Sequence, residues 1–235
     1  MLDLIIPVYN EEENIDYLIN QIINLKIYNK VEKIIFVNDG STDKTLEKIN
    51  FLRESNKKII QYDLQNRYGQ SQAIFEGVRY SNSLYNIVID GDGQIDPNDI
   101  DKIYIENLDK IKNGFSLISG IRINRNDNFV KKISSRVAFI MRKIILGDDC
   151  IDSSCPLRFF IREDFLQLPY FKNMHRFLPL IFKRENFNVH YVPINHKSRY
   201  KGKSKYGINN RVFVGIFDLI GVLWLIKRKK HPVNK

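Results

Sequence analysis

The chain has 235 residues, enough for one α/β domain with a sizeable core and a short extension. Apolar residues make up 43% of it and charged residues 27%, proportions that exclude a chain disordered throughout. The 37 lysines and arginines against 27 acidic residues give a net charge of +10, which indicates an anionic partner such as nucleic acid, lipid or a phosphorylated substrate.

In the first half of the chain, short apolar runs alternate with amphipathic stretches, which predicts parallel strands joined by crossover helices. Asn10 is the expected N-cap of the first helix, and Pro97 suits the first turn of the fourth. The expected strands are 2–8, 33–37, 58–62, 86–89 and 116–119. The expected helices are 11–23, 46–52, 70–79 and 97–108.

After Gly120 this alternation stops. Residues 121–135 are polar and basic and are expected to form a loop, followed by a helix at 137–146 and a strand at 189–192. The absence of a repeat or low-complexity linker predicts one domain, residues 1–208, with a C-terminal extension, residues 209–235. The two cysteines match no zinc spacing, and the N-terminal residues show no secretory signal pattern.

The extension is almost wholly apolar from Val212 to Ile226 and then turns basic. A helix of that length rises about 22 Å, short of the roughly 30 Å hydrocarbon core, and Asp218 further disfavours a span. We expect an amphipathic helix that lies on the membrane surface, anchored by Trp224 and the basic residues. A buried core helix with a solvated basic end is the alternative.

Polar clusters follow three of the expected strands, at residues 7–11, 37–41 and 90–94. Ligands of open α/β sheets bind outside the carboxyl ends of parallel strands, so these clusters predict one shared site. The chain has neither a Gly-x-Gly-x-x-Gly turn nor a phosphate-binding P-loop, so side chains would hold a nucleotide. Asp39 is a candidate acceptor for a base or ribose, and Tyr9 for packing on either.

Asp90 and Asp92 predict a metal site, because hard divalent cations prefer carboxylate oxygens. Glycines at 91 and 93 let the backbone turn there and approach a ligand closely. A metal at this turn would neutralise a diphosphate leaving group. The alternative is an acidic turn that caps the helix beginning near Pro97.

The motifs IPVYNEEENI (6–15), VNDGSTDKT (37–45), DGDGQIDP (90–97) and RYKGKSKYG (199–207) resemble those of the inverting family 2 glycosyltransferases, above all the dolichyl- and polyprenyl-phosphate sugar synthases. The resemblance covers roughly residues 2 to 226. It implies a GT-A fold, in which helices flank a Rossmann-like, mostly parallel central sheet, with Mg²⁺ or Mn²⁺ as cofactor.

The resemblance also assigns roles to individual residues. The nucleotide would be lined by Pro7, Tyr9, Glu11, Asp39, Gly69 and Asp90. The metal would be held by Asp90, Asp92 and Gln94, the acceptor phosphate by Arg122, Lys131 and Ser135, and the donor diphosphate by Arg199, Ser204 and Lys205. The residues expected to carry catalysis are Asp92, Arg122, Lys131 and Arg199. Lys131 departs from the pattern, because related synthases carry an arginine with a bidentate fork there.

The implied reaction is transfer of a hexose from a GDP- or UDP-sugar to polyprenyl phosphate at the cytoplasmic face of the membrane. The acceptor is already anionic, so positioning and charge stabilisation would replace a general base. A hydroxyl acceptor on a glycan, glycolipid or protein would need a base, for which Asp96 and Asp152 are candidates. A catalytically silent module that binds nucleotide sugar or anionic lipid is a third hypothesis.

The partners that follow are the nucleotide sugar, the lipid phosphate and an anionic membrane surface. The apolar extension also allows a membrane-protein partner or a homodimer. Nucleic acid is not expected, because the basic residues are not organised on a recognition helix or a known binding module.

Overall fold

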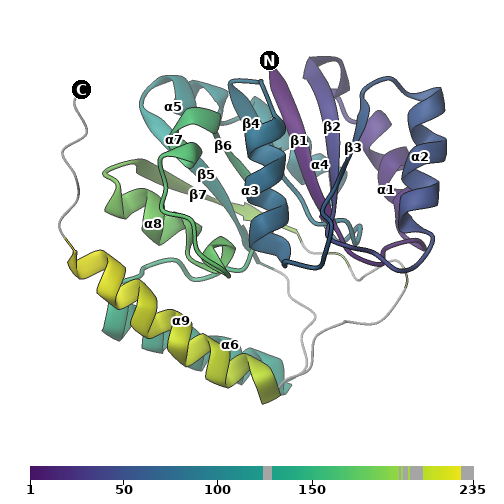
Figure 1. Ribbon diagram of the computed structural model, residues 1–235. Helices are drawn as coiled ribbons and strands as arrows, with labels where there is room; N and C mark the ends of the chain where they lie inside the picture. The colour runs from purple at the N-terminus through teal and green to yellow at the C-terminus, as the bar shows by residue number, and fades with distance from the viewer. Residues whose placement is uncertain (124–128, 196, 198–200, 202–208, 229–235) are drawn as a thin grey trace.

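The computed structural model describes residues 1–235 except 124–128, 196, 198–200, 202–208 and 229–235, and it is limited to the backbone at 129–134 and 209–214 (Figure 1). Its sheet has seven strands in the order β3-β2-β1-β4-β6-β5-β7. The strands are β1 (Leu2–Val8), β2 (Val31–Asn38), β3 (Ile59–Asp63), β4 (Tyr85–Val88), β5 (Phe115–Arg122), β6 (Arg158–Ile161) and β7 (Asn188–Ile194). The helices are α1 (Ile15–Ile23), α2 (Thr45–Ser55), α3 (Gln70–Tyr80), α4 (Pro97–Ile105), α5 (Leu108–Lys112), α6 (Phe129–Leu146), α7 (Arg162–Leu166), α8 (Leu178–Arg184) and α9 (Asn209–Lys227), with 3₁₀ turns η1 (Tyr28–Lys30) and η2 (Met174–Arg176).

Neighbouring strands run parallel except beside β6, which is antiparallel to both β4 and β5. The chain builds outward from β1 through β2 to β3 and then returns to place β4 on the other side of β1. This reversal is a topological switch point, where the loops after β1 and β4 diverge and leave room for a ligand. The mostly parallel sheet expected from the sequence is thereby confirmed.

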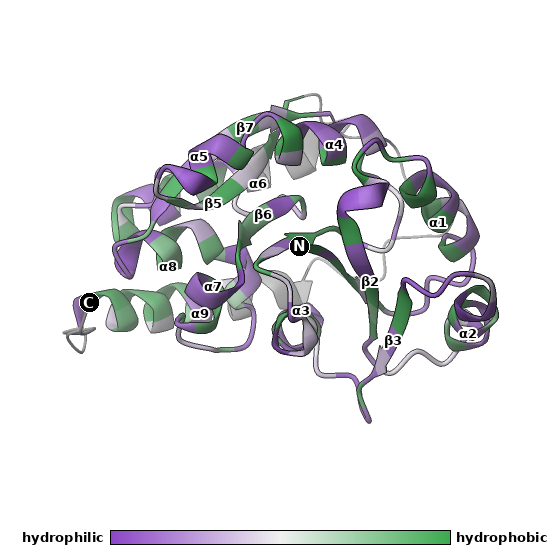
Figure 2. Ribbon diagram, turned by 90° about the horizontal axis from the view of Figure 1, so that it is seen from above, coloured by the Kyte–Doolittle hydropathy of each residue, from purple (hydrophilic) through white to green (hydrophobic). Residues whose placement is uncertain are grey.

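Helices cover both faces of the sheet, so its central strands are buried on both sides. Every residue of β1 is buried, with Leu4 and Ile6 in one apolar layer and Ile5 in the other. The first layer packs against α1, α2, α4 and α5, and the second against α3, α7 and α8 (Figure 2).

One strand, β6, was not predicted from the sequence, and two local expectations are wrong. β6 has only four residues and begins with a buried arginine, so its sequence shows neither alternation nor an uninterrupted apolar run. The loop expected over 121–135 ends early because α6 begins at Phe129; lysines and serines between its apolar positions make this helix polar in composition. The helix expected over 97–108 is divided, since α4 ends at Ile105 and Leu108 begins α5.

The helices α6 and α9 lie side by side beneath the sheet (Figure 1). The helix predicted over 212–226 is confirmed as α9, and Val222, which is 1% exposed, packs it into the second apolar layer. Within the described residues, none of the helices combines the length and the apolar character that crossing a membrane requires.

Candidate active site

The loops after β1 and β2 are joined at the carboxyl edge of the sheet. Val8 and Asn38 end their strands in register, and the amide of Asp39 donates to the carbonyl of Val8 over 2.9 Å. Asn10 is not the N-cap of α1, which begins at Ile15; it adopts a left-handed backbone with φ 53°. Its main-chain N–H donates to Ser41 Oγ over 2.9 Å, and its Oδ1 accepts from the amide of Thr42 over 2.7 Å.

Asp39 connects this edge to the start of α3. Its buried carboxylate accepts from the amide of Tyr68 over 2.7 Å and from the amide of Gly69 over 2.9 Å. Burial raises the pKa of Asp39, whereas these two amides and the charge of Arg67 lower it. Two of the residues predicted to line the nucleotide, Asp39 and Gly69, are therefore in direct contact.

Arg67 is a site residue that sequence reasoning missed. Its guanidinium carbon lies 4.0 Å above the ring of Tyr9, and its charge acts on Asp39. An exposed arginine in a loop carries no pattern of its own; the available signal was its place two residues before Gly69, which was predicted to line the nucleotide. The arginine and tyrosine present a flat cationic and aromatic surface suited to a base.

The turn after β4 packs closely against the end of β1. A Cβ atom added at Gly91 would lie 2.6 Å from Val8 Cγ1 and 3.2 Å from the carbonyl oxygen of Pro7. Gly93 has φ +70°, a conformation that side chains rarely adopt. The two glycines therefore let Asp90 and Asp92 approach Pro7 at the switch point.

Gly91→Ala is expected to lower the free energy of unfolding by about 1–3 kcal/mol and turnover at least tenfold, because the added methyl group displaces this turn. Urea unfolding and donor turnover measure the two effects. Gly221→Ala is the control, since no atom lies within 4 Å of its added Cβ and no loss is expected. Wild-type stability and turnover in Gly91→Ala would contradict the close approach.

The surroundings of Asp90 disfavour the charged form of its carboxyl group. Its pKa is raised from 3.8 to about 7, first by burial and then by the charge of Asp92, with Glu11 adding to the effect. The charges of Arg122 and Arg158 act in the opposite direction. The Gln70 side-chain amide donates to Asp90 Oδ1 over 2.6 Å.

Two neighbouring carboxylates at this turn, one of them with a raised pKa, suit a hard divalent cation that would bind both aspartates. Among the residues that the structure describes, no cluster holds three or more histidine, cysteine or acidic ligands. Mg²⁺ and Mn²⁺ do not need such a cage when waters and substrate phosphates complete the coordination. Asp90, Asp92 and Gln94 stay the predicted ligands.

Gln94 also binds the chain that follows β7. Its Nε2 donates to the carbonyl of Lys197 over 3.2 Å, and its own carbonyl accepts from the Lys197 amide over 3.0 Å. The ammonium group of Lys197 lies 3.2 Å from Asp96 Oδ2. The turn predicted to hold the metal is thus attached to the segment that leads into the late basic motif.

Arg122, at the end of β5, forms a bidentate ion pair with Asp152. Its Nε and Nη2 each donate over 2.7 Å to the two carboxylate oxygens, and its amide also donates to Oδ2 over 3.1 Å. Nη2 reaches Ser154 Oγ over 2.8 Å. The buried Asp152 therefore orients the arginine that was predicted to contact the acceptor phosphate.

Arg158 is a second residue without a role in the sequence analysis. It is 2% exposed, its Nη2 donates to the carbonyl of Ser153 over 2.6 Å, and its charge acts on Asp90. Its charge also reaches the half-buried His175, whose Nδ1 lies 2.7 Å from Ser71 Oγ. The sequence signal that could have identified Arg158 is its position as a charged residue directly before the apolar residues 159–161.

The remaining predicted residues fall in two groups. Arg199, Ser204 and Lys205 lie outside the described residues, as does the side chain of Lys131. Ser135 lies on α6 and is partly buried. The two cysteines are buried thiols, and burial raises the pKa of Cys150 to about 11 and that of Cys155 to about 12.

The family model for glycosyl transferase family 2 matches residues 3–168. A dodecaprenyl-phosphate galacturonate synthase of Rhizobium johnstonii is 30% identical over 236 residues, which cover 98% of this chain and 69% of that protein. An undecaprenyl-phosphate 4-deoxy-4-formamido-L-arabinose transferase of Yersinia pestis is 27% identical over 224 residues, covering 94% and 67%.

Solved structures with the same fold are more distant in sequence. Glucosyl-3-phosphoglycerate synthase from Mycobacterium tuberculosis, in complex with Mn²⁺, uridine diphosphate and glucosyl-3-phosphoglycerate, has a TM-score of 0.70 at 17% identity, covering 99% of this chain and 81% of that chain. A complex of that enzyme with Mg²⁺ and uridine diphosphate has a TM-score of 0.70 at 16% identity, covering 94% and 79%. These likenesses establish the GT-A fold.

Proposed function

We propose that this chain, which belongs to glycosyl transferase family 2 and is a glycosyltransferase, transfers a hexose from a UDP- or GDP-sugar to polyprenyl phosphate with inversion. The observation that carries the proposal is the pair of neighbouring carboxylates, Asp90 and Asp92, placed at the switch point where the charge of Arg122 also acts on Asp90. The names of the relatives, which specify sugar transfer to dodecaprenyl and undecaprenyl phosphate, support the lipid-phosphate acceptor.

The donor would lie along the carboxyl edge. Tyr9 and Arg67 offer the base a stacking surface, and Asp39 fixes the neighbouring loop. Asp90, Asp92 and Gln94 would hold Mg²⁺ or Mn²⁺, which supplies charge neutralisation for the departing nucleoside diphosphate. The side chains of the protein then bind and orient the donor while that charge develops.

The acceptor side favours a phosphate over a hydroxyl. A phosphate oxygen is already a nucleophile, whereas a hydroxyl needs a carboxylate that can take its proton. Asp152, one candidate for that base, already accepts hydrogen bonds on both oxygens from Arg122. Asp96, the other, accepts from the Asn98 amide and pairs with Lys197. Arg122 in turn gives a cationic group next to Asp90 toward which an anionic acceptor would be drawn.

A membrane surface would bring the lipid acceptor to the enzyme. The exposed apolar side chains of α6 and α9 make up what we call the α6–α9 patch: Val137, Ile140, Met141, Ile144, Ile216, Phe217, Ile220 and Trp224. Arg228 lies over the ring of Trp224 with 4.7 Å between guanidinium carbon and ring centroid, an aromatic and basic pair suited to the lipid headgroup region. We place this face on the cytoplasmic leaflet, where the nucleotide sugar is available.

Phe217→Asp is expected to weaken binding to vesicles containing anionic lipid at least tenfold, because it removes a large apolar contact and adds a repelled charge. Phe51→Asp on α2 is the matched control, since Phe217 is 73% exposed and Phe51 71%. Vesicle co-sedimentation measures the difference at equal thermal stability. Equal loss in both variants, or in neither, would remove the patch from the proposal.

The function is tested with a panel of UDP- and GDP-sugars against undecaprenyl phosphate, with Mg²⁺, Mn²⁺ or chelator. We expect release of nucleoside diphosphate that requires both the metal and the lipid phosphate, together with a new glycosylated lipid. Turnover with a glycan hydroxyl and none with undecaprenyl phosphate would overturn the acceptor. Full turnover in excess chelator would overturn the metal.

A further inference from the structure

Asn14, the residue before α1, binds the main chain of a residue 187 positions later. It is 2% exposed, and its Oδ1 accepts from the amide of Lys201 over 3.2 Å. Its Nδ2 lies 3.4 Å from the carbonyl of Lys201 and donates to Glu11 Oε2 over 2.6 Å. One buried carboxamide thus joins Glu11 to the returning chain.

The contact is specific to an amide side chain. A carboxamide carries a donor and an acceptor side by side, which matches the N–H and C=O of one residue, whereas a carboxylate has no donor and an alanine has neither. Because the partner is the main chain, the contact positions Lys201 independently of the lysine side chain. No other side chain type of similar size would satisfy Lys201 and Glu11 together.

Asn14 acts together with a second attachment close by in the sequence. The amide of Lys197 donates to the carbonyl of Gln94 over 3.0 Å, so the returning chain is bound at residues 197 and 201. The first attachment is to the turn that carries Asp92, and the second is to the loop that carries Glu11. Both loops lie at the carboxyl edge and carry residues predicted to bind the donor.

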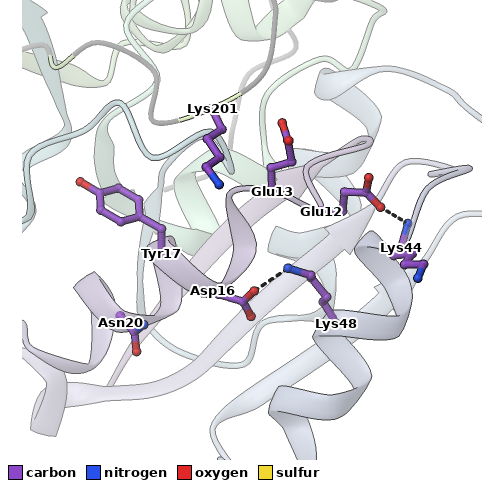
Figure 3. A pocket seen from close by; sticks show the side chains of 8 residues that line it. All are labelled: Glu12, Glu13, Asp16, Tyr17, Asn20, Lys44, Lys48 and Lys201. Atoms are coloured by element: carbon purple, nitrogen blue, oxygen red, sulfur yellow. Dashed lines mark hydrogen bonds and ion pairs between the residues drawn. The ribbon is translucent and has the colours of Figure 1, made fainter.

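The Lys201 side chain then enters a pocket between the loop and the first two helices. Figure 3 shows it approaching between Tyr17 and Glu13. Two neighbouring carboxylates on that side bind lysines of α2 or the residue before it: Asp16 pairs with Lys48, and Glu12 accepts from the main chain of Lys44 (Figure 3). Lys201 therefore lies beside the start of α1.

We propose that Asn14 is a positioning residue whose carboxamide fixes the main chain at Lys201 beside Glu11, and that donor binding depends on this attachment. The second half rests on the proposed function; the first does not. Lys201 is the third residue of the motif RYKGKSKYG, so the attachment holds one residue of that basic motif beside Asn14.

Amide hydrogen exchange on ¹⁵N-labelled protein tests the attachment without any substrate. In Asn14→Ala, which removes the acceptor of the Lys201 amide, we expect that amide to exchange at least tenfold faster, while the Lys197 amide, which donates to Gln94, keeps its wild-type rate. Asn20→Ala is the matched control, because Asn20 lies on α1 and lines the same pocket. An unchanged Lys201 rate in Asn14→Ala would overturn the proposal, and so would equal acceleration of Lys197, which would mean general loosening.

Donor binding tests the consequence. We expect Asn14→Ala to raise the KM for the donor, and the Kd of its nucleoside diphosphate with Mn²⁺, about tenfold, with kcat reduced less than threefold, because the attachment is lost and the reacting groups remain. Unchanged KM and Kd in a variant with faster Lys201 exchange would overturn the link to donor binding. If the wild type neither binds nucleotide nor turns over, the proposed function fails, and the exchange result alone decides on the attachment.

Discussion

Replacing Asp90 with asparagine is expected to abolish turnover and, in the absence of divalent metal, to make the protein more stable. Turnover should fall by about 10³ or more, because asparagine offers the cation a neutral oxygen in place of a charged one. Stability should rise because Asp90 is a desolvated carboxylate beside Asp92, and asparagine carries no charge to bury.

The gain in stability of Asp90→Asn over the wild type should increase with pH. The pKa of Asp90 is raised from 3.8 to about 7 in the folded protein, so folding binds a proton there, and wild-type stability falls as pH rises between these values. Asparagine does not titrate. The variant should therefore match the wild type near pH 4 and exceed it most above pH 7. At about 1.4 kcal/mol per pH unit, the gain in the free energy of unfolding has an upper limit of about 4 kcal/mol. Because the folded protein can rearrange around the charged carboxylate, we expect a gain of about 1–3 kcal/mol.

Urea unfolding at pH 4.5, 6 and 8 with chelator measures this effect. Asp92→Asn is the comparison: it removes the second cause of the raised Asp90 pKa, so it should give a smaller gain with a comparable loss of turnover. Mn²⁺ with nucleoside diphosphate should raise the unfolding temperature of the wild type alone. An Asp90→Asn protein that is less stable than the wild type at pH 8 would show that the carboxylate stabilises the fold.

Much of the fold could be predicted because it rests on local patterns. β1 is apolar except for Asp3 and is buried along its whole length, and the strand expected over 2–8 is found with those bounds. The glycines of the turn after β4 were expected to let the backbone approach a ligand; in the structure Gly91 lies close to Val8 and Pro7. β6 could not be found, since a four-residue strand between two others depends on its neighbours and begins with the buried Arg158. The start of α6 was also not predicted, because the lysines and serines between its apolar positions give this segment the composition of a loop.

The site was predictable in its location and less so in its contacts. The motifs place Glu11, Asp39 and Asp90 at one edge, yet none of them indicates that Asp39 holds Tyr68 or that Arg67 covers Tyr9. Those contacts join residues far apart in the sequence, and a side chain's choice among several partners depends on the packing of the whole edge.

Breaking the ion pair between Arg122 and Asp152 is the second large effect that we expect. Asp152→Ala leaves a buried guanidinium without its bidentate partner, and Arg122→Met leaves a buried carboxylate. Each should lower the free energy of unfolding by about 3–5 kcal/mol, and the double variant by clearly less than the sum. Urea unfolding of the four proteins gives the coupling. Lys183→Met, which breaks the exposed pair with Asp149, is the control and should cost under about 1 kcal/mol.

The same variants separate the two acceptor hypotheses. If Asp152 orients Arg122, Asp152→Asn should lower turnover about 10² through a misplaced arginine while the pH dependence of kcat/KM keeps its shape. If Asp152 is instead the base for a hydroxyl acceptor, Asp152→Asn should remove the acidic limb of that profile. Three hydrogen bonds from Arg122 and one from Ser154 end on the Asp152 carboxylate and favour the first outcome. A carboxylate that already accepts on both oxygens is poorly placed to take a proton from a hydroxyl acceptor. Loss of the acidic limb without loss of stability would overturn the orienting role and favour a hydroxyl acceptor.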